Sequence, residues 1–76
     1  MLPLVFADTG GSYVISGISG SPTVRQHLES MGLTVGSTVK VVSSLAGNLI
    51  LQVKESRVAL GCDLAKKIMI NNRKAG

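Results

Sequence analysis

The stretch from Pro22 to Gly36 constrains the fold of this chain more strongly than any other stretch; its sequence is PTVRQHLESMGLTVG. Ser21 followed by Pro22 is a good helix start, because serine accepts a hydrogen bond from a free first-turn amide and proline lacks only an amide that would be unpaired anyway. Gly32 comes where the helix must end, since glycine adopts the left-handed cap conformation without a Cβ clash. The stretch therefore predicts one helix that begins at Pro22 and ends before Gly32.

This helix has one apolar face and is followed by a second turn. Its apolar residues recur at the spacing of a single helix face: Val24, Leu28 and Met31. After the glycine, Leu33 is expected to pack back on Leu28, and Gly36 is free to take a positive φ in a tight turn. Packing and turn geometry thus assign structural roles to four positions: Leu28, Met31, Gly32 and Gly36.

The remaining chain is typical of short strands separated by turns. Apolar residues at every second position indicate half-buried strands, and five stretches fit this description: 12–18, 37–43, 49–54, 57–60 and 67–70. Residues 62–65 fit a single helical turn. Five short strands at intervals of about ten residues favour a small barrel, which removes exposed sheet edges. We therefore expect a mainly β fold, a small five-stranded barrel with one α-helix between the first two strands.

Length and composition fit a single domain over residues 1–76, with residues 71–76 as a flexible tail. The 45% apolar content allows a core without a metal or a disulfide. The one cysteine, Cys62, cannot form an internal disulfide, which fits a reducing compartment. No apolar run approaches the roughly 18 residues of a membrane-spanning helix. We therefore expect a cytoplasmic protein.

The net charge of +4 keeps a nucleic-acid-binding small barrel open as an alternative function. The basic residues are scattered, however, apart from one group near the C-terminal end: Lys66, Lys67, Arg73 and Lys74. Phe6 and Tyr13 are the only aromatic residues, which is too few for a platform on which bases stack. We therefore expect no nucleic acid among the partners.

The sequence offers little support for catalysis. It contains no nucleophile paired with a base and no pair of acids in a catalytic pattern. The glycine-containing segment 17–20, GISG, lacks the lysine and the length of a phosphate-binding loop. We therefore expect that the protein is not an enzyme.

Metal binding has three weak candidates: His27, Cys62 and Asp63. A thiolate with an imidazole suits a transition metal, but only if the fold brings His27 to Cys62. The C-x-x-C and H-x-x-x-H spacings of common metal sites are absent. The simpler interpretation is a solvated histidine and a buried cysteine without a ligand. We expect no cofactor, and weak transition-metal binding stays open as an alternative.

Several motifs resemble the ferrous-iron transport protein A (FeoA) family. The segment from Arg25 to Ser37, RQHLESMGLTVGS, is similar to the family's R-x-x-L-x-x-M-G-L/M-x-P-G segment. Residues 15–20 resemble the family's strand before the helix, and residues 59–68 resemble its C-terminal part. Val35 stands where the family usually has proline, and Gly61 stands where arginine is common. The resemblance covers nearly the whole chain.

This resemblance implies both a fold and a role. The implied fold is an SH3-like small β-barrel with a helical insertion. The implied role is a cytoplasmic accessory protein of bacterial ferrous-iron uptake, whose partner is FeoB, a membrane transporter with a cytoplasmic GTP-binding domain. On this hypothesis, four residues of the helix and its turn contact the partner: Arg25, His27, Glu29 and Leu33. A metal-sensing SH3-like domain and the nucleic-acid-binding barrel stay open as alternatives.

Overall fold

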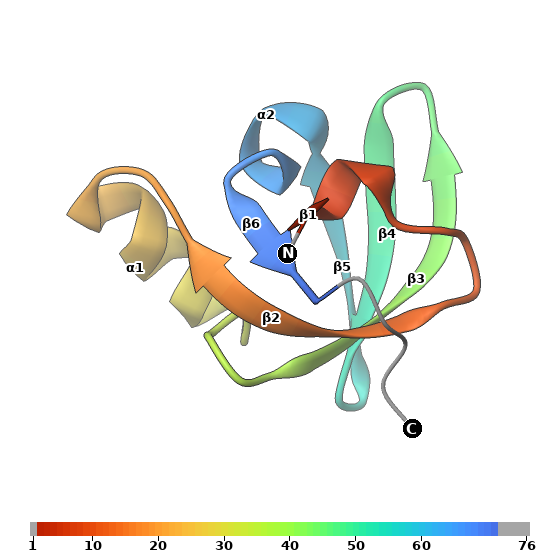
Figure 1. The fold of residues 1–76 in the computed structure, drawn as a ribbon, viewed down its shortest axis with the longest axis horizontal. Helices are drawn as coiled ribbons and strands as arrows, with labels where there is room; N and C mark the ends of the chain where they lie inside the picture. Colours follow the sequence, from red (N-terminus) through yellow and green to blue (C-terminus); the bar gives the residue numbers. More distant parts are fainter. Residues whose placement is uncertain (1, 72–76) are drawn as a thin grey trace.

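A computed structural model describes residues 2–71, and strands dominate its secondary structure (Figure 1). The six strands are β1 (Leu2–Pro3), β2 (Ser12–Ile18), β3 (Thr38–Leu45), β4 (Asn48–Val53), β5 (Ser56–Gly61) and β6 (Ile68–Ile70). The helical elements are the 3-10 helix η1 (Leu4–Phe6) and the α-helices α1 (Pro22–Ser30) and α2 (Cys62–Ala65). The basic residues Arg73 and Lys74, and all but the first residue of the expected tail 71–76, lie outside the described residues.

The strands form one antiparallel sheet in the order β1-β6-β2-β3-β4-β5. A mainly β fold with one longer helix agrees with the sequence analysis, but the number of strands, the closure of the barrel and the position of the helix differ. The structure has six strands, and within residues 2–71 no hydrogen-bonded pairing joins the edge strands β1 and β5 into a closed barrel. Helix α1 consequently lies between the second and third strands rather than between the first two.

The additional strand, β1, accounts for the strand count and for the position of α1 in the strand order. β1 has only two residues, one of them proline, and its register partners Ile70 and Met69 come from the other end of the chain. Two residues are too few for a period-two pattern, so the local sequence carries no signal for this strand. Its pairing with β6 places it at one edge of the sheet, beyond the five strands that the sequence predicts.

The core lies inside the curved sheet. Alternate residues of the strands point into it, as in β4, where Leu49, Leu51 and Val53 are buried. The register shifts between Ile15 and Gly17 in β2, and between Val41 and Ser43 in β3. Such irregularities bend a strand and increase its twist, which helps the sheet curve around the core. No charged side chain of residues 2–71 is buried.

Candidate interaction surface

Helix α1 lies at one end of the molecule and begins with a side-chain cap (Figure 1). The Val24 N–H donates to Ser21 Oγ at 3.3 Å, and Pro22 occupies the first helical position. Leu28 is completely buried, whereas Val24 and Met31 are partly buried against the core. One face of the helix is therefore fixed to the sheet, and the opposite face is left to solvent.

The end of α1 is a glycine-based stop. Gly32 has φ 87°, its N–H donates to Glu29 O at 2.9 Å, and the Leu33 N–H donates to Leu28 O at 3.0 Å. These two bonds are those of the Schellman motif, which satisfies the free carbonyls at a helix end. The motif turns Leu33 into the core, where its exposed fraction is 0%.

A second turn ties this end of the helix to strand β2. The Ser37 N–H donates to Thr34 O at 3.0 Å, and Gly36 has φ 94°, as the third position of a type II turn requires. The Gly36 N–H donates to Ile15 O at 2.8 Å, and the Ile15 N–H donates to Ser37 O at 2.9 Å. The helix is thus held by its apolar face and, after its C-terminal end, by this turn.

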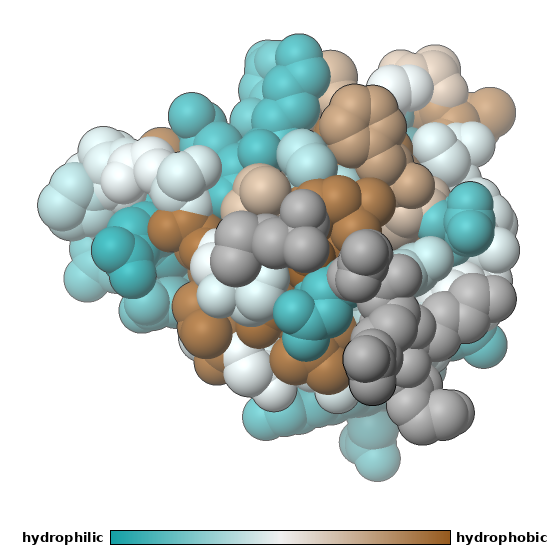
Figure 2. Space-filling model, viewed as in Figure 1, coloured by the Kyte–Doolittle hydropathy of each residue, from teal (hydrophilic) through white to brown (hydrophobic). Residues whose placement is uncertain are grey.

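The outer face of α1 borders a shallow hollow of about 350 Å³. The residues that line it are Gly20, Pro22, Arg25, Gln26 and Glu29. Arg25 and Glu29 are exposed and lie four positions apart on the helix, yet they form no ion pair with each other. No other charged side chains of residues 2–71 form an ion pair either. In Figure 2 this end of the molecule, at the left, is covered mainly by hydrophilic and intermediate residues. We call Arg25, Gln26 and Glu29 with this hollow the α1 surface.

The residues expected to contact a partner occupy different environments. Arg25 and Glu29 border the hollow, whereas His27 is exposed outside its lining, and its carbonyl accepts a hydrogen bond of 2.6 Å from Ser30 Oγ. Leu33 is fully buried by the Schellman motif, so its side chain does not reach a partner in this conformation. Sequence reasoning missed Gln26, because glutamine on a helix face has no distinctive spacing.

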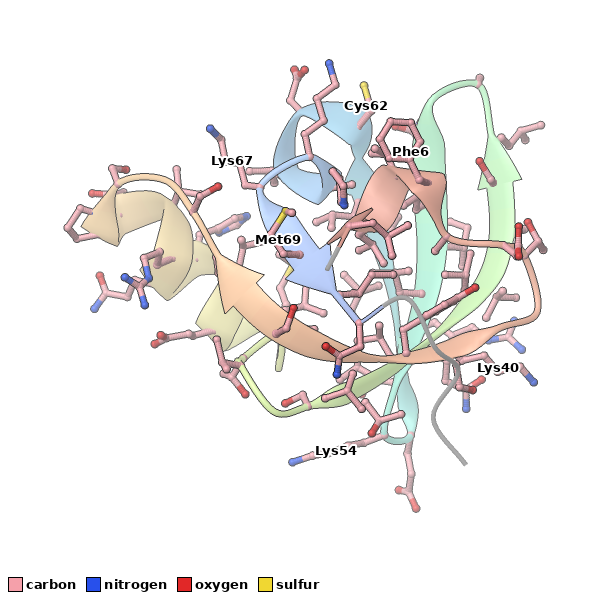
Figure 3. All side chains as sticks on the ribbon, viewed as in Figure 1. Phe6, Lys40, Lys54, Cys62, Lys67 and Met69 are labelled. Atoms are coloured by element: carbon pink, nitrogen blue, oxygen red, sulfur yellow. The ribbon has the colours of Figure 1, made fainter. Side chains whose placement is uncertain are left out.

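The candidate metal ligands do not meet. Cys62 is half-buried at the first position of α2, Asp63 beside it is exposed, and His27 lies on α1, at a different end of the molecule (Figures 1 and 3). Among the described residues, no three His, Cys, Asp or Glu side chains are grouped as a metal site would need.

The open antiparallel sheet with a helix inserted before β3 defines a small SH3-like β domain. Residues 2–72 match the FeoA domain family, and the chain belongs to that family. The resemblance found in the sequence is therefore confirmed. In the part of the chain that the structure describes, the helices lack the length and apolar character needed to cross a membrane.

Two relatives and one more distant protein illustrate the similarity. The chain is 37% identical over 76 residues to a protein of Methanocaldococcus jannaschii named as an Fe(2+) transport protein A, covering 100% of this chain and 93% of that protein. The crystal structure of an iron uptake regulatory protein (FeoA) matches with 37% identity and a TM-score of 0.85, covering 92% of this chain and 93% of the other. A manganese-dependent transcriptional repressor matches with 22% identity and a TM-score of 0.82, covering 90% of this chain and 39% of the repressor. At that identity, the repressor shares the fold alone.

Proposed function

We propose that this protein is a non-catalytic accessory protein of ferrous-iron uptake that binds the cytoplasmic GTP-binding domain of a FeoB-type membrane transporter. The observation that carries the proposal is membership of the FeoA family over residues 2–72. The names of two relatives, an Fe(2+) transport protein A and an iron uptake regulatory protein, support the link to iron. On this proposal the protein works in the cytoplasm as a single domain, and it acts by contact rather than by chemistry.

The α1 surface is the contact region that we assign to this role. Arg25 is a strong anchor for a partner, because its planar guanidinium can hold a carboxylate with two hydrogen bonds. Glu29 lies beside it without an ion-pair partner among the described residues, so both charges are available to complementary groups. Because Leu28 and the turn after α1 already attach the helix to the sheet, little ordering of the helix is needed when a partner binds.

The test is a binding measurement between the full chain and the transporter's cytoplasmic domain, loaded with GTP, loaded with GDP, and free of nucleotide. Arg25→Glu should weaken binding at least about tenfold, which corresponds to about 1.4 kcal/mol. Lys66→Glu is the matched control, because it makes the same charge change at an exposed residue after α2, outside the α1 surface. Absence of binding in every nucleotide state would contradict the proposal.

A further inference from the structure

A second polar surface crosses the outer face of the sheet, apart from α1. The strand register places Lys40 of β3 opposite Gln52 of β4, and Gln52 opposite Arg57 of β5. The residues that precede and follow Lys40, Val39 and Val41, are both completely buried. Because side chains alternate between the two faces of a strand, the row formed by Lys40, Gln52 and Arg57 faces outward.

Lys54 adds a third cation at the end of this row. It follows β4 directly, in the turn to β5, and both Lys40 and Lys54 project from the ribbon into solvent (Figure 3). We call Lys40, Gln52, Lys54 and Arg57 the cationic row. Glu55 is the neighbouring acid in the turn, yet no carboxylate of residues 2–71 lies within ion-pairing distance of these cations. These cations therefore form no direct ion pair with the described part of the chain.

A surface hollow of about 510 Å³ borders three members of the row, Lys40, Gln52 and Lys54, while Arg57 lies outside its lining. Its lining residues are Ser37, Thr38, Lys40, Gln52, Val53 and Lys54. The hydroxyl, amide and ammonium groups around the hollow can all donate hydrogen bonds, and Val53 and the aliphatic parts of the lysines add apolar surface between them. This set favours a ligand that carries acceptors and negative charge.

The spacing of the cations indicates the shape of that ligand. Lys40 and Arg57 are separated by one strand, so their backbones lie roughly 10 Å apart at the usual strand spacing. Charges spread over this width suit several negative groups along an extended chain better than one small anion. A nucleic acid would gain from exposed aromatic rings, but Tyr13 is buried at 5% exposure and Phe6 lies on η1, away from the hollow.

We propose that the cationic row binds an extended acidic segment of a partner protein, with its carboxylates on Lys40, Lys54 and Arg57 and its backbone beside Gln52. The proposal goes beyond the α1 contact. It rests on strand register and charge, and it holds whether or not the α1 surface binds a transporter.

The test uses a short fluorescent peptide in which glutamate alternates with serine, and a control peptide with glutamine in place of glutamate. Anisotropy titrations with the full chain should show binding of the acidic peptide only, weakening as salt is added. The double variant Lys40→Gln/Arg57→Gln should lose about tenfold in affinity, because two charge contacts are removed. Lys66→Gln/Lys67→Gln makes the same net-charge change outside the row, and it should change affinity less than about twofold.

Amide NMR shifts of the unmodified protein provide a readout that does not depend on how the variants fold. Addition of the acidic peptide should move the signals of Thr38, Lys40, Gln52, Lys54 and Arg57. Equal affinity losses in the two double variants would overturn the proposal, since they would indicate attraction by net charge alone. No binding at low salt, or tighter binding of a DNA or RNA oligonucleotide at the same residues, would also overturn it.

Discussion

Gly32 and Gly36 both take positive φ, but their surroundings differ. A Cβ atom built on Gly32 would lie 3.3 Å from Val53 Cγ1, whereas one built on Gly36 would have no atom within 4 Å. Backbone strain therefore acts at both positions, and crowding acts only at Gly32. This difference between two glycines in one turn region allows the two costs to be measured separately.

We predict that Gly36→Ala lowers the free energy of unfolding by about 1–2 kcal/mol, the cost of a left-handed conformation for a residue with a Cβ atom. Gly32→Ala should cost more than Gly36→Ala, because Val53 must also shift. Urea unfolding of the two variants measures both values. Equal stability of Gly36→Ala and the unmodified protein would show that the turn does not need its positive φ.

Val35 is a further residue at which the turn geometry predicts whether a substitution raises or lowers stability. It precedes Gly36 at the second position of the type II turn, a position that favours proline. Its side chain is 57% exposed, and its N–H makes no backbone hydrogen bond to the described residues. Val35→Pro should therefore stabilise the protein by about 0.4–1 kcal/mol, by reducing the freedom of the unfolded chain. Thermal unfolding against Val35→Ala checks this; a lower melting temperature for the proline variant would contradict the turn assignment.

At the scale of elements, one side chain, Leu28, contributes most to the attachment of α1 to the sheet. Leu28 is buried completely, while Val24 and Met31 are only partly buried. Because the helix has few other contacts with the core, its orientation depends on Leu28 and on the turn that bonds to Ile15. The conformational order of the α1 surface therefore depends on this attachment.

Leu28→Ala should lower the free energy of unfolding by about 2–5 kcal/mol, through lost burial and the cavity that remains. Val24→Ala should cost less, since Val24 loses fewer buried atoms, and Thr23→Ala on the exposed side should stay within about 0.5 kcal/mol. Denaturant unfolding of the three variants gives the order. A Leu28→Ala cost no larger than that of Thr23→Ala would show that α1 is not anchored in this way.

The elements that sequence reasoning predicted are those with a local signal. Three such signals involve only a few neighbouring residues, and each corresponds to an observed element: the helix cap at Ser21, the glycine stop at Gly32 and the alternation from Leu49 to Val53. Strand β1 has no such signal, because only its pairing with Met69 and Ile70 defines it. The same glycine stop indicates that Leu33 packs into the core, where the structure places it. The prediction that Leu33 contacts a partner overlooked this signal.

At the scale of the whole molecule, the candidate surfaces depend on relations that span the chain. A register shift after Val41 sets how β3 pairs with β4, and it is this pairing that places Lys40 in one row with Arg57. The spacing of residues in the sequence does not reveal the shift. The hollow at α1 likewise combines Gly20, before the helix, with Glu29 near its end. Composition therefore indicates a basic protein, whereas only the fold shows where its charges gather.

The central claim is that the α1 surface contacts a FeoB-type transporter. The most direct measurement is an NMR titration of the isotope-labelled full chain with the transporter's cytoplasmic domain in its GTP-bound and GDP-bound states. We predict that amide signals of Arg25, Gln26 and Glu29 shift in at least one state, and that Arg25→Glu abolishes these shifts while Lys66→Glu preserves them. Unmoved signals along α1 in both states, or shifts confined to other elements, would contradict the account.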